Sequence, residues 1–351
     1  MRVLQNPDRQ PTNPYPGHLF EALIAAGADM RRYDARAGLT AGADILHVHW
    51  PQAAPPAVGV KARLIYWLRL IGERSLVAPI LRARGGRIVW TVHNLGAHDY
   101  RPGPLGRFFW RRFLSQCDAT VHLSEAGRAR AFEELTAIAG KPSYVIPHGT
   151  YPEAEALTIS RAAARAALGL PTEGRILLHF GMIRPYKNVP ALIAAFAEAA
   201  PPDWRLVVAG KVHADAQGLN AALRAAADGA ARVDLRLGYV DDEELGRLVR
   251  AADLCAFPYR QIFNSGSVHY ALAAGRAVVV PASAVFDELA GRFGDRWFRR
   301  YSGALDASAL AKLLADAPPT EDQRPDLSSI AWDRVAAATL AAYQDLQARS
   351  V

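Results

Sequence analysis

Short apolar segments alternate along the chain with longer stretches in which apolar residues recur every three or four positions. A short apolar run bounded by turn residues indicates a buried strand, and the three-to-four recurrence indicates a helix. In the first half, strands are predicted at residues 2–5, 44–50, 87–92, 119–123 and 143–147. Helices are predicted there at residues 17–26, 60–84 and 105–115.

The second half follows the same plan. Its predicted strands are residues 175–180, 205–209, 233–237, 254–258 and 277–281, and its predicted helices are 189–199, 218–227, 242–251, 267–274 and 332–347. Alternation of this kind predicts the α/β class, with two doubly wound, Rossmann-like parallel sheets. We expect domains at 1–155 and 156–328, a linker near 150–172, and a final helical segment at 329–351. Ligands of such domains bind in a cleft at the carboxyl ends of the strands.

Composition narrows the class of protein. The 351 residues are 51% apolar and 21% charged, which is typical of globular proteins and excludes wholesale disorder. No run approaches the ~20 apolar residues needed to cross a bilayer, and the first residues have no signal-peptide core. The two cysteines, Cys117 and Cys255, make neither a disulfide framework nor a thiolate metal site. These features predict a cytoplasmic protein.

The net charge of +7 is unevenly distributed. Residues 59–113 hold eleven basic residues and only two acidic ones. Nucleic acid, an anionic membrane surface or a phosphorylated substrate could each explain this excess, and so could a solvated basic face. The helix predicted at 60–84 carries Leu64, Leu68 and Trp67 beside basic residues, which suits an anionic membrane surface and equally suits a helix facing the core.

The most informative motif is divided between two predicted strand ends of the second half. His179–Lys187 runs from a strand into a loop with two cations, Arg184 and Lys187, and Phe257–Ser267 runs through a polar loop into a helix. Cations together with the N–H groups at a helix start form a cradle for a diphosphate. The predicted donor diphosphate-binding residues are Arg184, Lys187, Ser265, Gly266 and Ser267. Either segment alone would be better explained by surface charges and a helix cap, and the two together, at strand ends of one domain, favour the cradle.

Other phosphate-binding motifs are missing from the sequence. There is no G-x-x-x-x-G-K-[ST] loop, no G-x-G-x-x-G after a strand, and no D-x-D pair of a metal–diphosphate clamp. We therefore expect protein cations to neutralise the phosphates, with no metal and no further cofactor.

Candidate catalytic residues follow strands in the first half. His93, His98 and Asp99 occupy one strand-end loop, where Asp99, or else a histidine, could take a proton from an acceptor hydroxyl. A turn stabilised by Asn94 and Asp99 is the simpler alternative. His47 and His49 share one face of a strand but lack a third metal ligand. Residues expected to border the donor and acceptor cleft are Asn13, Tyr15, His49, Asn94, Gly181, Tyr259 and Asn264.

Taken together, these motifs resemble those of GT-B glycosyltransferases. The similarity is strongest to the xanthan-pathway family of GDP-mannose:glycolipid 4-β-D-mannosyltransferases, and it rests on Thr12–Tyr15, His47–Pro51, His93–Leu95, His148-Gly149, His179–Lys187 and Asn264–Gly266. The resemblance implies an acceptor-binding first domain, a nucleotide-sugar-binding second domain and a terminal helix that crosses back onto the first. It also implies an undecaprenyl-diphosphate-linked oligosaccharide acceptor at the inner face of the membrane.

The sequence departs from the larger retaining GT-B family. Ile262 and Tyr270 occupy the spacing of its two glutamates, Met182 replaces a usual arginine, and Asn188 stands where glycine is common. These departures favour the β-mannosyltransferases over the retaining enzymes, and the resemblance to the β-mannosyltransferases implies an inverting hexosyltransferase of exopolysaccharide synthesis that uses GDP-mannose. A UDP-sugar donor is one alternative, and a non-catalytic basic protein that binds nucleic acid or another anion is a weaker one.

Overall fold

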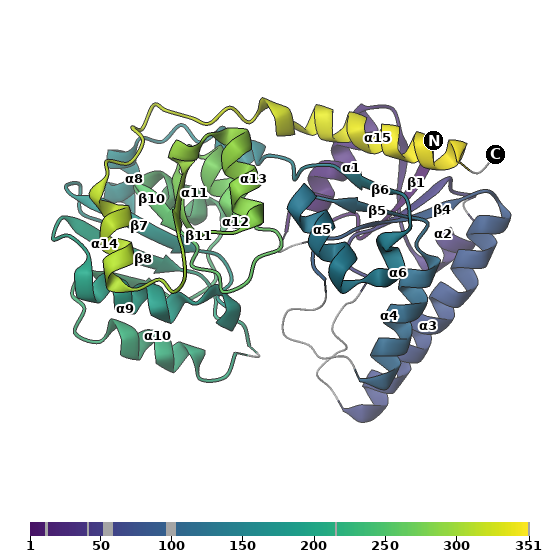
Figure 1. Ribbon diagram of the computed structural model, residues 1–351, viewed down its shortest axis with the longest axis horizontal. Coiled ribbons are helices and arrows are strands. Elements are labelled where there is room, and N and C mark those ends of the chain that lie inside the picture. The colour runs from purple at the N-terminus through teal and green to yellow at the C-terminus, as the bar shows by residue number, and fades with distance from the viewer. Residues whose placement is uncertain (11–12, 41, 52–58, 96–102, 215, 350–351) are drawn as a thin grey trace. The chain divides into compact units, whose positions relative to one another are not determined.

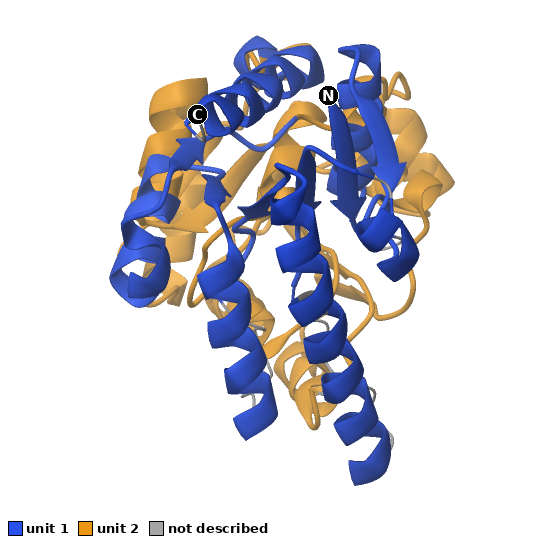
Figure 2. Ribbon diagram, turned by 90° about the vertical axis from the view of Figure 1, so that its right-hand side faces the viewer, with its two compact units in different colours: residues 1–149, 328–351 blue, residues 150–327 orange. Residues whose placement is uncertain are grey.

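The computed structural model describes the chain except residues 11–12, 41, 52–58, 96–102, 215 and 350–351 (Figure 1). It divides into two compact units, residues 1–149 with 328–351 and residues 150–327 (Figure 2). Each unit contains a six-stranded parallel sheet flanked by helices, which is the predicted α/β class.

The sheet of unit 1 has the strand order β2-β1-β3-β4-β5-β6. Its strands are β1 (Arg2–Asn6), β2 (Asp29–Arg32), β3 (Ile45–Val48), β4 (Arg87–Thr91), β5 (Ala119–His122) and β6 (Ser143–Val145). Its helices are α1 (Tyr15–Ala25), α2 (Ala35–Thr40), α3 (Val60–Ala83), α4 (Pro104–Gln116), α5 (Glu125–Glu134), α6 (Thr136–Ala139) and α15 (Trp332–Ala348), with the 3₁₀ turn η3 (Ser328–Ile330) before α15.

The sheet of unit 2 has the order β12-β11-β10-β7-β8-β9. Its strands are β7 (Arg175–Phe180), β8 (Trp204–Ala209), β9 (Val233–Arg236), β10 (Leu254–Ala256), β11 (Ala277–Pro281) and β12 (Phe298–Tyr301). Its helices are α7 (Pro152–Glu155), α8 (Arg161–Ala167), α9 (Val189–Ala199), α10 (Leu219–Ala227), α11 (Asp242–Ala251), α12 (Gly266–Ala273), α13 (Ala284–Phe293) and α14 (Ala307–Ala315), with 3₁₀ turns η1 (Pro185–Lys187) and η2 (Asp295–Trp297).

Two strands are absent from the sequence prediction, and both are edge strands. β2 has the sequence DMRR and is largely exposed, and β12 has the sequence FRRY with a half-buried centre. An edge strand needs no continuous apolar run because only one side of it pairs. The apolar pattern therefore found the inner strands and the edge strands β6 and β9, and missed these two.

The predicted linker at 150–172 is wrong. This segment contains α7 and α8, and α8 packs against α11. The cause is a buried ion pair, since the Arg165 guanidinium lies 2.7 Å from an Asp253 carboxylate oxygen and donates to the Ala251 and Thr172 carbonyls. Buried charges stay buried only when paired in this way, so the pair fixes α8 to unit 2.

The last helix, α15, packs against α1 and completes the core of unit 1 (Figure 1). Val335, Tyr343 and Leu346 of this helix lie in one buried cluster with Tyr15 and Leu19 of α1. The residues after 328 thus belong structurally to the first unit, although more than half of the chain separates them from it.

In each sheet, the chain first adds strands on one side of its first strand and then adds the next strand on the other side. In unit 1 the chain runs from β1 to β2 and then places β3 on the other side of β1. In unit 2 it runs from β7 to β8 and β9 and then places β10 on the other side of β7. The loops that leave the two central strands at such a reversal point diverge and open a crevice at the carboxyl edge of the sheet.

Candidate functional site

The predicted diphosphate cradle lies at the reversal point of unit 2. One of its segments follows β7 and the other follows β10, and these two strands are hydrogen-bonded neighbours. Two further bonds join the loops, because the Arg260 N–H donates to the Tyr186 carbonyl at 2.9 Å and the Arg260 Nε donates to Asn188 Oδ1 at 3.1 Å. Strand order therefore brings together motifs that are about 80 residues apart in the sequence.

Gly181, Lys187 and Ser267 converge within this cradle. Gly181 has a φ of +97°, which disfavours other residues. A β-carbon at Gly181 would lie 3.3 Å from Ser267 Oγ and 3.4 Å from Lys187 Nζ. The glycine therefore keeps open the space onto which a hydroxyl and an ammonium both point.

The second wall of the cradle is the start of α12. Ser265 caps this helix by accepting from the Val268 N–H at 3.3 Å, and its hydroxyl lies 2.8 Å from the Tyr259 hydroxyl. A β-carbon on Gly266 would lie 2.4 Å from the Tyr151 hydroxyl. A larger residue at this position would displace Tyr151, so glycine allows the Tyr151 hydroxyl to lie against the start of the helix, whose first N–H groups and dipole favour an anion.

The electrostatics of the cradle are cationic. Lys187 is only 7% exposed, and burial together with the nearby Arg184 lowers its pKa to about 8. Arg184 is half-buried on the same loop. No carboxylate contributes to the electrostatic environment of Lys187 in the part of the chain that the structure describes. A buried cation without a counter-ion is unfavourable, and an anionic ligand relieves that cost.

A buried histidine lies beneath this cation. His179 donates from Nδ1 to the Ala256 carbonyl at 2.8 Å, which leaves Nε2 unprotonated and, among the described residues, without a hydrogen-bond partner. Burial and the charge of Lys187 lower the pKa of His179 to about 3. His179 is therefore neutral and adds no charge to the cradle.

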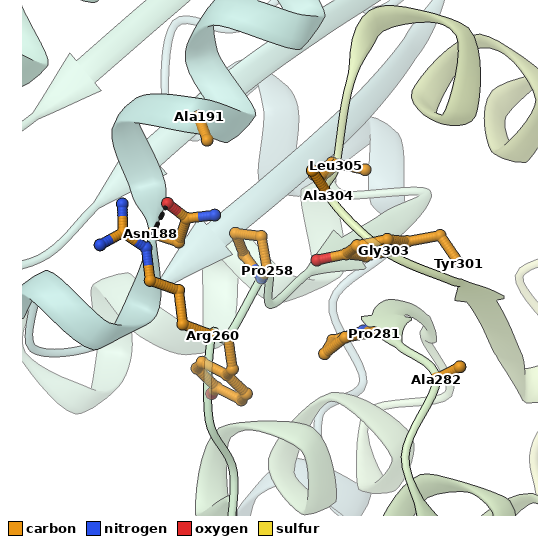
Figure 3. A pocket seen from close by; sticks show the side chains of 11 residues that line it. Asn188, Ala191, Pro258, Arg260, Pro281, Ala282, Tyr301, Gly303, Ala304 and Leu305 are labelled. Carbon is orange, nitrogen blue, oxygen red and sulfur yellow. Dashed lines mark hydrogen bonds between the residues drawn. The ribbon is translucent and has the colours of Figure 1, made fainter.

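A pocket of about 550 Å³ adjoins the cradle at the carboxyl ends of β10, β11 and β12 (Figure 3). Tyr259 belongs to both sites, because its ring lines the pocket and lies 6.0 Å from Lys187 Nζ. The linked side chains of Asn188 and Arg260 form one wall of the pocket. Arg260 is the one charged residue among those that line it, so the pocket favours neutral or anionic groups.

The candidate histidines of unit 1 follow β3 and β4. His49 Nδ1 lies 3.1 Å from His93 Nε2, and the Trp50 ring stacks on His93 with centroids 4.4 Å apart. Both histidines are buried. Burial and the nearby His47 lower the pKa of His93 to about 3. Burial, His47 and His93 together lower the pKa of His49 well below its usual value. Both rings are therefore neutral, and they share one N–H between them.

The predicted cleft residues Asn13 and Tyr15 have structural roles here. Asn13 Oδ1 accepts from the Tyr15 N–H at 3.1 Å at the start of α1. The Tyr15 side chain is 1% exposed, and its ring packs edge-on against His93 and Trp332. In this structure Tyr15 is thus a core residue of unit 1 and not a surface residue of the loop.

The remaining predicted residues lie outside the described ranges or beside residues already discussed. His98 and Asp99 lie outside the described residues, and Asn94 and Asn264 are half-buried beside His93 and Ser265. Sequence reasoning missed three residues that shape the site, namely Tyr151, Asn188 and Arg260. The sequence analysis noted that Asn188 stands where glycine is common but gave it no place in the site, and the residue has a φ of +56°. No local signal marks Tyr151, which reaches Gly266 only through the fold.

No group of three or more histidine, cysteine, aspartate or glutamate side chains that could hold a metal occurs within the described ranges. His47 and His49 are adjacent, with ring centroids 4.4 Å apart. The nitrogens of His47 lie instead 2.6 Å from the hydroxyl oxygens of Thr91 and Tyr343.

Comparison with known proteins defines the class. The family model for glycosyl transferases group 1 matches residues 174–316. The fold matches sucrose-phosphate synthase from Thermosynechococcus elongatus with a TM-score of 0.62, 18% identity and coverage of 98% of this chain and 94% of that one. It also matches Anabaena HepE in complex with UDP and glucose, with a TM-score of 0.61, 15% identity and coverage of 100% and 98%. The fold is GT-B, as the sequence predicted.

A relative covers nearly the whole length of the chain. The GDP-mannose:glycolipid 4-beta-D-mannosyltransferase of Xanthomonas campestris pv. campestris is 30% identical over 331 residues, which span 92% of this chain and 86% of that protein. The D-inositol 3-phosphate glycosyltransferase of Segniliparus rotundus is 33% identical over 168 residues, 43% of this chain and 35% of that protein. The chain belongs to the GDP-mannose:glycolipid 4-beta-D-mannosyltransferase family of GT-B glycosyltransferases.

Proposed function

We propose that this glycosyltransferase moves mannose from GDP-mannose, with inversion, onto a lipid-linked oligosaccharide in exopolysaccharide synthesis. The observation that carries the donor site is the buried, unneutralised Lys187, which meets Ser267 at Gly181 beside the first N–H groups of α12. This arrangement suits a diphosphate. The mannosyltransferase relative supports mannose as the sugar and a glycolipid as the acceptor.

The reaction we propose is a single displacement. An acceptor hydroxyl attacks the anomeric carbon while the bond from that carbon to the diphosphate oxygen breaks, and the hydroxyl proton passes to a base. Arg184, Lys187 and the N–H groups of α12 stabilise the charge that grows on the leaving diphosphate. Because the sequence has no D-x-D pair, we assign this neutralisation to protein cations and propose no metal or cofactor.

Asp99 is our first choice for the base, followed by His98 and His93. His93 is the weakest of the three in this structure, because its ring is buried, neutral and paired with His49. Full activity of Asp99→Asn would exclude Asp99 as the sole base. Full activity of His93→Gln would likewise exclude His93 as the sole base.

The donor site is tested by Lys187→Ala with Lys211→Ala as a matched control, because Lys211 is an exposed lysine of unit 2. We expect Lys187→Ala to lower transfer from GDP-mannose to membrane lipid extract by at least a hundredfold, and Lys211→Ala to leave it unchanged. Anomer-resolved NMR of the product reports inversion. Normal transfer by Lys187→Ala would contradict the cradle, and thermal stabilisation by UDP but not GDP would favour a UDP-sugar donor.

We further propose that unit 1 binds an anionic membrane surface through α3 and α4, which lie side by side (Figure 1). No helix within the described ranges is long and apolar enough to span a bilayer. Of the nine exposed large apolar residues among those described, five are on α3 and one, Phe108, is on α4. Val60, Leu64 and Leu68 recur at intervals of four and so share one face of α3.

The charge around this face suits anionic lipid. Exposed basic side chains on the two helices are Lys61, Arg63, Arg69, Arg107, Arg111 and Arg112. The single acidic residue on them, Glu73, accepts from the Tyr33 hydroxyl at 2.6 Å. The core-facing side of α3 is separate and includes Trp67, which is 5% exposed. An exposed apolar row with a basic border is the pattern of a helix that lies in the headgroup layer.

Vesicle cosedimentation tests the surface, with phosphatidylglycerol-containing and purely phosphatidylcholine vesicles. We expect Leu64→Gln with Leu68→Gln to weaken binding to the anionic vesicles about tenfold or more. Ile24→Gln is the control, since Ile24 on α1 is as exposed as Leu64, at 45% each. Equal binding to both vesicle types, or equal loss in the control, would contradict the proposal.

A further inference from the structure

The groups that the structure places beside Lys187 among the described residues are neutral or cationic. Arg184 shares its loop, and the Tyr259 ring from the loop after β10 lies 6.0 Å from Nζ. His179 on β7 is neutral, and the Ser267 hydroxyl at the start of α12 is uncharged. A carboxylate would stabilise the protonated form of Lys187, and none of these groups carries a negative charge that could do the same.

Burial without a counter-ion weakens the hold of a lysine on its proton. Lys187 is 7% exposed, and its pKa is lowered to about 8. A diphosphate in the cradle would counteract both burial and the charge of Arg184, the two causes of the lowered pKa, because it brings negative charge and hydrogen-bond acceptors to Nζ. The protonation state of this residue therefore depends on whether an anion is present.

We propose that Lys187 takes up a proton when a nucleoside diphosphate binds, so that donor and product binding are coupled to protonation at alkaline pH. This inference rests on the proposed function, which places a diphosphate in the cradle. The product carries one more negative charge than the sugar ester, because its terminal phosphate is free. The lysine is then most firmly protonated when the leaving group bears its full charge.

The direction of the pH effect follows from linkage. Below about pH 8 the free protein already carries the proton, and the affinity for GDP is constant. Above that pH, binding must recruit a proton, so the affinity falls by up to about tenfold per pH unit. We expect GDP to bind about tenfold more weakly at pH 9 than at pH 7.

Calorimetric titration of the full chain with GDP at pH 8.5 measures the proton directly. The titration is run in two buffers of different ionisation enthalpy, whose difference in apparent heat gives the number of protons taken up. We expect about 0.7 proton per GDP, because roughly three quarters of the free lysine is then unprotonated. GDP itself contributes little, since phosphate monoesters lose their second proton near pH 6.

Lys187→Arg is the matched control, because arginine keeps the charge at this pH and cannot exchange the proton. We expect this variant to bind GDP with no proton uptake. NMR of ¹³C-labelled lysine gives a second measurement if the variant binds too weakly. The Lys187 signal, assigned by its absence from the variant, should titrate near pH 8 in the free protein and above pH 10 with GDP.

The outcomes separate the two proposals. Binding of GDP with no proton uptake at pH 8.5, or equal uptake by Lys187→Arg, overturns the coupling and leaves the donor site intact. Absence of GDP binding at every pH from 7 to 9 overturns the donor assignment itself. Uptake in the wild type that disappears in Lys187→Arg supports both.

Discussion

The hydroxyl of Tyr343 lies 2.6 Å from Nδ1 of His47, although 296 positions separate the two residues. Nε2 of the same ring lies 2.6 Å from the Thr91 hydroxyl, so both nitrogens of a fully buried histidine have partners. The helix α15 thus provides one of the polar contacts on which the core of unit 1 depends. The chain thus returns to its first unit with both apolar and polar contacts.

Tyr343→Phe should therefore destabilise the protein. Removing the hydroxyl leaves a buried ring nitrogen unpaired, which costs about 1–3 kcal/mol. Urea unfolding measures the change, and Tyr239→Phe is the control because Tyr239 is 83% exposed. An equal change in the two variants would show that the His47 contact adds no stability.

Acid should destabilise the protein through the histidines of unit 1. Burial lowers the pKa of His47 and of His93 to about 3, whereas an unfolded histidine binds a proton near pH 6.5. Their contribution is complete above pH 6.5 and is lost as the pH falls below it, because only the unfolded chain then binds protons. In that range, each histidine lowers the free energy of unfolding by about 1.4 kcal/mol for every pH unit of acidification.

The melting temperature at pH 7 and pH 5 measures this loss. We expect a clear decrease at pH 5 and a smaller decrease in His93→Asn, which carries one fewer buried imidazole. A melting temperature that is the same at both values of pH would contradict the burial of neutral histidines.

Gly266→Ala should disturb the start of α12. The added β-carbon would lie 2.4 Å from the Tyr151 hydroxyl, and displacement of either group costs about 1–3 kcal/mol. In the double variant with Tyr151→Phe the nearest ring atom is 3.6 Å away, which is an ordinary contact. We therefore expect Tyr151→Phe to restore most of the stability and of the GDP affinity lost in Gly266→Ala, as measured by thermal shift. A double variant no better than Gly266→Ala would contradict this steric account.

Asn188→Gly and Asn188→Ala should differ in stability. Asn188 has φ and ψ of +56° and +30°, a left-handed conformation that costs alanine about 1 kcal/mol more than glycine. Both variants lose the bond from Arg260 Nε, so their difference isolates the backbone term. Urea unfolding should show the glycine variant to be more stable by about that amount. Equal stability would mean that the turn after Lys187 relaxes.

The inner strands of both sheets could be predicted from the sequence, whereas the edge strands β2 and β12 could not. Every strand that the apolar pattern predicted is present, because inner parallel strands are apolar along their length. The edge strands β2 and β12 and the helix α8 escaped prediction, since they depend on one-sided pairing and on the buried Arg165–Asp253 pair. In the site, the positions of Lys187 and Ser267 after their strands were predictable. The contact of Tyr151 with Gly266 was not.

The sequence by itself determined the inner strands of both sheets, the helices that it predicted between them and the polar residues that follow strand ends, because side-chain periodicity is a local property. Only the tertiary structure decided that β10 lies beside β7, that Lys187 is buried with no carboxylate acting on it among the described residues, and that Tyr343 meets His47. Strand order and burial result from packing of the whole chain, so residues distant in sequence contribute to them as much as neighbours do. The chemistry of the cradle depends on that packing, since the same lysine on the surface would keep its ordinary, higher pKa and bind a phosphate only weakly.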